Sequence, residues 1–274
     1  MEMLLPKRCR INTLMKKFNI KLLVLSFLLL ISLRPLQSAE MVDPIKVDWS
    51  FKGLTGTFDR ASLQRGFQVY KEVCASCHSM QYLSYRNLGE PGGPEFSVQE
   101  VKAIAASFEI EDGPDSQGEM FTRPGKPSDK FKSPYPNVQA ATAANGGAYP
   151  PDMSVLVKAR KGGANYIYSV LVGYEDPPPG VTLDDGVYYN KYMAGNKIKM
   201  PNNLIDGLVE YADGTESTVD QMAKDVTTFL AWAAEPELEE RHKTGVKVII
   251  YLVLLTILVY LSMKKIWSRI DPEV

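Results

Sequence analysis

Apolar residues recur at helical spacing in two separate stretches of this 274-residue chain. In residues 59–78 the apolar side consists of Leu63, Phe67, Tyr70, Cys74 and Cys77. Farther along, a comparable stripe consists of Val219, Met222, Ala223, Val226, Phe229 and Leu230. The spacing predicts two amphipathic helices that pack against each other. Asp59 or Ser62 can cap the first helix, Ser217 or Thr218 can cap the second, and Pro236 ends it.

Outside these two stretches, the sequence from residue 40 to residue 208 predicts few regular elements. Residues 40–58 are expected to be extended, and a third helix is expected over residues 153–172, softened at Gly162 and Gly163. Residues 120–152 are rich in Pro, Gly, Ala and Asn, and residues 175–186 contain Pro177-Pro178-Pro179, so both are expected to be loops. Residues 188–208 are expected to be irregular. The pattern therefore predicts a mainly α domain wrapped by long loops.

Two longer apolar runs stand near the ends of the chain. Residues 22–33 follow a long basic stretch and precede Gln37-Ser38-Ala39, which predicts an export signal peptide over residues 1–39. An uncleaved N-terminal anchor is the alternative. Residues 246–263 are apolar except for Lys247, long enough for one spanning helix, although a buried helix of a soluble core would look similar.

These runs predict the domain organisation. The signal peptide would be followed by an exported domain over residues 40–243, a transmembrane anchor over residues 244–267 and a cytoplasmic tail over residues 268–274. The basic residues flanking the anchor are balanced, so the exported N-terminus sets the orientation. We expect a bacterial inner-membrane protein whose folded domain lies on the periplasmic side.

Charge points to the class of partner. The chain carries a net charge of −1, and removal of residues 1–39 would leave about −7. An acidic surface argues against nucleic acid and favours basic partners. Residues 89–119 hold eight acidic side chains against Lys102 alone. That run is either a solvated face or a docking surface for a basic electron carrier.

The most specific motif is Cys74-Ala75-Ser76-Cys77-His78. A C-x-x-C-H run attaches haem c covalently, because two thiols three residues apart on a helix share one face. His78 would then be the proximal iron ligand. A redox dithiol or a structural disulfide is the alternative. The remaining cysteine, Cys9, lies in the predicted signal peptide.

The sixth iron ligand is less sharply indicated. The second histidine, His242, lies beside the predicted anchor, so it would require the haem to lie at the bilayer surface. Met80 is too close to His78, and Met222 belongs to the apolar stripe. Among Met120, Met153, Met193 and Met200, the long irregular segment before residue 208 favours Met200 first and Met193 second.

Several ordered blocks resemble the cytochrome c1 family from about residue 45 to residue 270. They include residues 65–71 before the haem motif, 120–126, 143–148, 150–154 and 232–237. The resemblance places the family's axial methionine at Met200, in Ile198-Lys199-Met200, and assigns Arg160 to a haem propionate. Two residues depart from the family pattern: Lys161 stands where a histidine is usual, and Lys199 is an unusual charge beside the axial ligand.

The resemblance implies a cytochrome c-like domain with one covalent haem c, serving in a quinol–cytochrome c reductase complex. Its partners would be cytochrome b, a Rieske iron–sulfur protein that delivers the electron, and a cytochrome c that accepts it. With both axial positions filled, the chain would carry electrons without catalysing bond formation. The competing hypotheses are an anchored cytochrome c of another respiratory complex and a haem peroxidase with an open sixth position.

Overall fold

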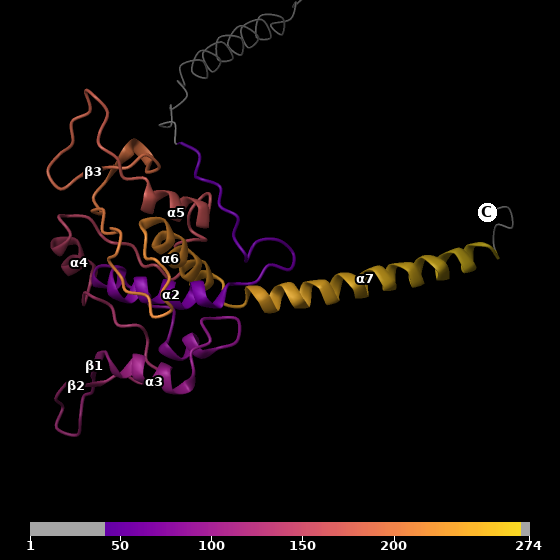
Figure 1. Cartoon of the computed structure of the whole chain (residues 1–274). Coiled ribbons are helices and arrows are strands. Elements are labelled where there is room, and N and C mark those ends of the chain that lie inside the picture. Colours follow the sequence, from indigo (N-terminus) through magenta and orange to yellow (C-terminus); the bar gives the residue numbers. More distant parts are fainter. Residues whose placement is uncertain (1–41, 270–274) are drawn as a thin grey trace, which may run out of the picture. The chain divides into compact units, whose positions relative to one another are not determined.

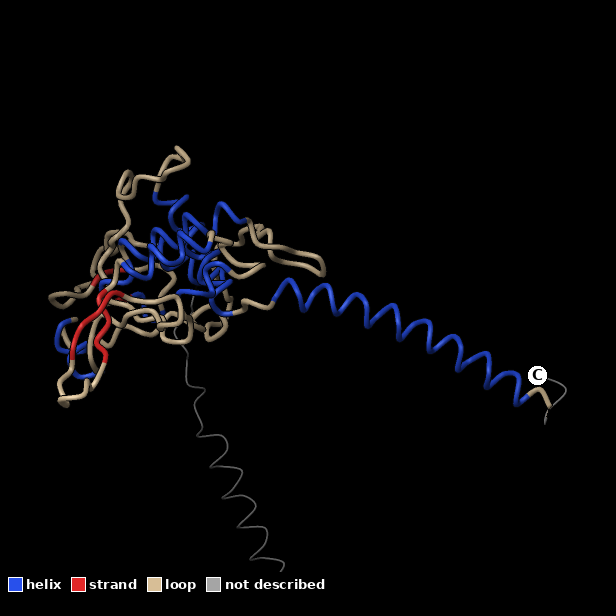
Figure 2. The backbone as a smooth tube through the Cα atoms, turned by 90° about the horizontal axis from the view of Figure 1, so that it is seen from below, coloured by secondary structure: helices blue, strands red, loops and turns tan. Residues whose placement is uncertain are grey.

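The structure, a computed structural model, describes residues 42–269. The predicted signal peptide and most of the predicted cytoplasmic tail lie outside the described residues. Within the described range the chain is mainly α-helical, with long loops and two small antiparallel sheets of two strands each (Figure 1, Figure 2). The predicted fold class is thereby confirmed.

Helix α2 (Arg60–Glu72) is the first of the two predicted amphipathic helices. The Asp59 carboxylate accepts the backbone N–H of Ser62 at 2.7 Å, as an N-cap does. The prediction that this helix reaches residue 78 is wrong. It ends at Glu72, and a 3₁₀ turn, η1 (Cys74–Ser76), follows. In that turn Cys77 and His78 both donate backbone N–H groups to the Cys74 carbonyl, at 3.1 and 2.9 Å.

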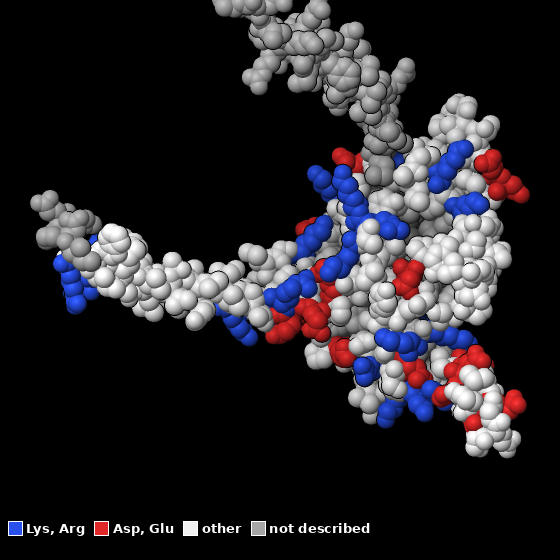
Figure 3. Space-filling view, turned by 180° about the vertical axis from the view of Figure 1, so that it is seen from behind, with Lys and Arg blue, Asp and Glu red and all other residues white. Residues whose placement is uncertain are grey.

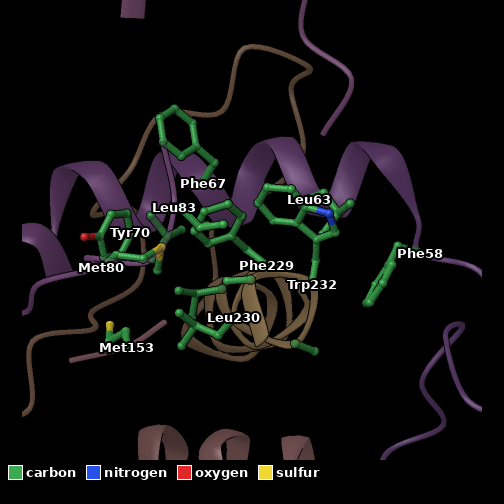
Figure 4. Packing of buried hydrophobic residues seen from close by; sticks show 14 of the residues in the cluster. Phe58, Leu63, Phe67, Tyr70, Met80, Leu83, Met153, Phe229, Leu230 and Trp232 are labelled. Atoms are coloured by element: carbon green, nitrogen blue, oxygen red, sulfur yellow. The ribbon is translucent and has the colours of Figure 1, made fainter. Parts of the chain in front are cut away.

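Helix α6 (Val219–Ala234) is the second, and Thr218 caps it by accepting the Gln221 N–H at 3.1 Å. It packs on α2 as predicted, and side chains of the two helices interleave (Figure 4). The backbones touch at Gly66, where an added Cβ would lie 2.1 Å from the Asp225 carbonyl oxygen. Only glycine permits that approach.

A buried ionic network crosses the same contact. The Asp225 side chain is fully buried and accepts hydrogen bonds from Arg65 Nε at 2.8 Å, Ser62 Oγ at 2.6 Å and Gln221 Nε2 at 3.0 Å. Because a buried carboxylate is tolerated only when it is paired and hydrogen-bonded, these donors fix the register of α2 against α6.

Between α2 and α6 the chain forms short helices and a two-stranded hairpin. A 3₁₀ helix, η2 (Tyr85–Gly89), and helix α3 (Val98–Ala106) precede a hairpin of β1 (Glu109–Asp112) and β2 (Phe121–Pro124). Helix α4 (Val138–Ala144) follows. Two elements interrupt residues 120–152, which the sequence predicts to be loop. Strand β2 forms by pairing with β1, and helix α4 forms because Asn137 provides an N-cap for an alanine-rich stretch.

The third predicted helix forms only in its second half. Helix α5 (Ala164–Val172) begins after Gly162 and Gly163, whose φ angles of +94° and +56° break the helical path. Residues 42–49 are extended as predicted, but residues 50–55 form turns, contrary to the prediction. The extended stretch binds α5: Ile45 N–H donates to Ser169 Oγ at 2.8 Å and Trp49 Nε1 donates to Asn165 Oδ1 at 2.7 Å. Strands β3 (Tyr188–Tyr189) and β4 (Lys197–Ile198) flank the 3₁₀ turn η3 (Ala194–Asn196).

Helix α7 (Leu238–Trp267) contains the predicted anchor but begins six residues before its expected start. Arg60 tethers its first turn, donating to the Glu239 carboxylate at 2.7 and 2.9 Å. The helix is long and apolar enough to cross a membrane, and its most apolar 18-residue window is unburied. Figure 3 shows an uncharged middle with basic side chains toward both ends, which suits a bilayer.

Candidate haem site

One large cavity of about 570 Å³ lies among α5, α6, the end of η1 and the loops of residues 144–156 and 186–204. Its walls are mainly apolar. Close-packed protein interiors do not leave voids of this size, whereas sites for organic cofactors fall in this range. The cavity therefore has the size and the lining of a cofactor site.

Cys74, Cys77 and His78 all line this cavity. Both cysteines are free thiols, so the structural-disulfide alternative finds no support in the described residues. In the 3₁₀ turn, residues three apart are eclipsed, which places the two thiols on one side. Burial, together with the neighbouring Cys77, raises the pKa of the Cys74 thiol to about 12. The shortened α2 thus presents the thiol pair as the motif requires.

The imidazole of His78 is held in a defined orientation. It is 9 % exposed, and its Nδ1 lies 2.8 Å from the carbonyl oxygen of Pro151. If Nδ1 donates to that carbonyl, Nε2 is left with the lone pair that ligates a metal. Burial lowers the pKa of His78, although Pro151 and Asp152 act against it. A neutral ring is the form that binds iron.

Asp152 braces the Pro151 loop against the residues after the motif. Its carboxylate accepts Ser79 Oγ at 2.8 Å, the Gln81 N–H at 3.0 Å and the Ser154 N–H at 2.9 Å. Burial acts to raise the pKa of Asp152, but these hydrogen bonds hold it below its ordinary value. The brace keeps the carbonyl that orients His78 in place.

Met200 and Met193 both line the cavity. The Met193 thioether accepts the Tyr166 hydroxyl at 3.3 Å, a contact that competes with a metal for the sulfur lone pair. Met200 is held by its backbone instead, because the Tyr174 hydroxyl donates to its carbonyl oxygen at 2.9 Å. This arrangement leaves the Met200 sulfur outside that hydrogen bond.

The other candidate ligands are less well placed. Met153 lines the cavity but is buried in the core, whereas Met120 is 55 % exposed on the β1–β2 hairpin and does not line it. His242 does not line it either: its Nδ1 lies 3.0 Å from the Gly56 carbonyl beside the start of the anchor. The geometry therefore gives no support to bis-histidine ligation.

Arg160 and Lys199 are the formally charged residues in the lining, and the described residues contribute no carboxylate to it. Arg160 is exposed and takes part in no ion pair among the described residues. A lining with positive charge and no carboxylate of its own suits the two propionate carboxylates of a haem. Thiols, imidazole, apolar walls and cations together fit haem c.

The acidic run of residues 89–119 contributes nothing to the lining. Several of its side chains have local structural roles. Glu100 completes a capping box with Ser97, Glu95 pairs with Arg60, and Asp112 pairs with Arg123. These contacts are those of a structured, solvated face, and the docking hypothesis for this run stays a prediction.

The profile of the Cytochrome C1 family matches residues 49–270. The chain belongs to the cytochrome c1 family. Cytochrome c1 of Rhodospirillum rubrum is 48 % identical over 241 residues, which cover 82 % of this chain and 88 % of that protein. A mitochondrial cytochrome c1 heme protein of Solanum tuberosum is 55 % identical over 206 residues, covering 75 % and 78 %.

A longer relative is the cytochrome b/c1 of Bradyrhizobium diazoefficiens, 50 % identical over 239 residues and 80 % of this chain. The chain spans 35 % of the length of that protein. Cytochrome c1 proteins carry one covalently bound haem c, the group that the cavity fits. With bacterial relatives and helix α7, this chain is a membrane-anchored member of the family.

The sequence pattern indicates the cysteines, the histidine and the methionines of the site, but it does not indicate the groups that hold these side chains in position. Pro151 and Asp152 were seen only as part of a family block, and the hydroxyls of Tyr166 and Tyr174 were not noticed. These contacts join residues more than 25 positions apart, so no local pattern could reveal them.

Proposed function

We propose that this chain is the haem-bearing electron-transfer subunit of a cytochrome bc1 complex. The observation that carries the proposal is one cavity lined by Cys74, Cys77, His78 and Met200. Cys74 and Cys77 would hold haem c through thioether bonds, and His78 and Met200 would ligate its iron. Arg160 binds a propionate, since a guanidinium suits a carboxylate.

Haem c supplies one-electron chemistry, and the chain determines how it is used. The Pro151 carbonyl, fixed by Asp152, keeps the His78 ring oriented, and burial favours its neutral form by lowering its pKa. The apolar walls exclude water and favour the less charged state of the metal. A thioether ligand together with an imidazole ligand would raise the reduction potential further. Two protein ligands would leave no position on the iron for a reactant, so the subunit would carry electrons and catalyse no bond formation.

The partners follow from the proposed complex. Cytochrome b would hold the quinol sites, a Rieske iron–sulfur protein would deliver the electron, and a cytochrome c would accept it. The name of the Bradyrhizobium relative, cytochrome b/c1, supports an association with cytochrome b. The acidic exported domain would speed encounter with a basic acceptor, with a strong dependence on salt.

The proposed topology places the haem domain on the periplasmic side of a bacterial inner membrane, with α7 as its single span. Export of the domain places the thioether chemistry outside the cytoplasm. The predicted boundaries at residues 39, 243 and 267 are part of this proposal.

A matched pair of variants tests the ligand set. Met200→Leu should abolish the absorption band of methionine-ligated iron, open the haem to carbon monoxide and lower the potential, on the order of 100 mV or more. Met193→Leu, in the same cavity, should leave all three properties nearly unchanged. The reverse result would refute the assignment. Rapid carbon monoxide binding by the unaltered protein would favour a haem peroxidase instead.

A further inference from the structure

We propose that Lys199 is a positioning residue that holds the Met200 segment closed over the cavity. Its ammonium group ties this segment to the loop that leads to Pro151 and the His78 side of the site. The inference rests on the proposed function, because it takes Met200 as an axial ligand.

The tie is a single hydrogen bond across a long sequence separation. Lys199 Nζ donates to the Gly146 carbonyl oxygen at 2.7 Å, and 53 residues separate the two. Both residues line the cavity and both are exposed, so the bond lies at the rim of the cavity. The neighbouring Gly147 is close as well, since a Cβ there would lie 3.7 Å from the same nitrogen.

The other hydrogen bonds of residues 197–200 run in a different direction. Strand β4 pairs with β3 through Tyr188↔Ile198 and Tyr189↔Lys197. The Tyr174 hydroxyl holds the Met200 carbonyl, and Lys197 Nζ donates to the Thr182 carbonyl at 3.3 Å. These partners all belong to residues 174–189. The Lys199 bond reaches the loop of residues 144–151 instead.

That loop also determines the geometry of the other proposed ligand. Gly146 stands five residues before Pro151, whose carbonyl orients His78. A cationic donor makes a stronger hydrogen bond than a neutral one. Lys199 therefore joins the Met200 segment to the loop that carries Pro151, and its removal should free the Met200 segment without unfolding the packed helices.

The test uses the full-length protein in its native membrane complex and compares Lys199→Gln with Lys197→Gln. The control removes the same charge two residues away but leaves the tie between the two loops intact. Lys199→Arg keeps a cationic donor. Two properties are measured: imidazole binding to the oxidised haem, which requires the methionine to leave, and amide hydrogen exchange in residues 142–150 and 194–202.

We expect Lys199→Gln to bind imidazole about fivefold more tightly and to exchange faster in both loops, as loss of one hydrogen bond implies. Lys197→Gln should match the unaltered protein in the 142–150 loop and in imidazole affinity, and Lys199→Arg should restore most of both properties. Equal effects of the two glutamine variants, or faster exchange with unchanged imidazole affinity, would overturn the positioning role.

The Met200→Leu variant keeps the two proposals distinguishable. If it retained the methionine band while Lys199→Gln exchanged faster, the ligand assignment would fail and the tie between the loops would stand. If it lost the band while Lys199→Gln resembled the unaltered protein in exchange and affinity, the ligand assignment would stand and the inference about Lys199 would fail.

Discussion

The two sides of the cavity are built in different ways. The side that presents Cys74, Cys77 and His78 is the continuation of α2, which is packed against α6 so closely that a Cβ at Gly66 would lie 2.1 Å from a backbone oxygen. The side that presents Met200 is a segment of two-residue strands and a 3₁₀ turn, half-buried or exposed through most of its length. There Gly195 has open space around it.

This difference separates the residues that would attach the haem from the residues that would tune its iron ligation and reduction potential. The His78 side is densely packed and would be bound covalently to the haem, so we expect it to open only when the whole domain unfolds. A segment held by a few polar contacts opens locally at a lower free energy. We therefore expect changes near Met200 to alter ligation and potential while the fold survives, and changes at the helix crossing to affect the whole domain.

The largest expected effect is at the helix crossing. Gly66→Ala places a methyl group inside the contact with Asp225 and 2.8 Å from Phe229 Cβ. Neither partner can move away without separating the helices, so we expect unfolding to become easier by at least about 3 kcal/mol, or the domain not to accumulate. Urea unfolding followed by far-ultraviolet circular dichroism measures this loss.

Gly195→Ala is the matched substitution on the other side. Its φ of +75° makes alanine unfavourable, but no neighbouring atom obstructs a side chain. We expect a loss of about 1 kcal/mol. Equal destabilisation by the two alanines would show that the two sides are not built differently.

The sequence predicts the His78 side of the cavity better than the Met200 side, because the His78 side is built from local patterns. The spacing of Leu63, Phe67 and Tyr70 defines a helix face, and the C-x-x-C-H run is local, so both could be interpreted without a structure. The end of α2 at Glu72 could not, because apolar periodicity continues through Cys74 and Cys77 while the backbone tightens into a 3₁₀ turn. On the Met200 side, the sequence pattern alone does not decide which of several methionines is the sixth iron ligand.

Acid should loosen a third region that polar contacts hold. Arg123 on β2 donates to the Asp129 carboxylate at 2.6 Å, and this hydrogen bond holds the pKa of Asp129 below its usual range. The charged form stabilises the fold, so its contribution is present above the unfolded pKa near ~3.9 and disappears as pH falls through the lower folded value.

Hydrogen exchange in the β1–β2 hairpin, corrected for intrinsic rates, should therefore accelerate relative to α2 below about pH 4. An Asp129→Asn variant should show the faster exchange already at pH 6 and a weaker acid response. If α2 and the hairpin loosened together in acid, the contrast between packed and polar attachment would not hold for this hairpin.

The smallest expected effect concerns the second tie on the Met200 side. Tyr174→Phe removes the hydroxyl that donates to the Met200 carbonyl while keeping the ring. Burial raises the pKa of Tyr174 above its usual value, so this hydroxyl stays a donor even in alkali. We expect a loss of about 1 kcal/mol or less, seen as a modest gain in imidazole affinity with an unchanged urea midpoint. Tyr188→Phe is the control, because Tyr188 lines the same cavity but is 41 % exposed. A shift of the urea midpoint in Tyr174→Phe would mean that the Met200 segment unfolds together with the helices. The two sides of the cavity would then not differ in how they open.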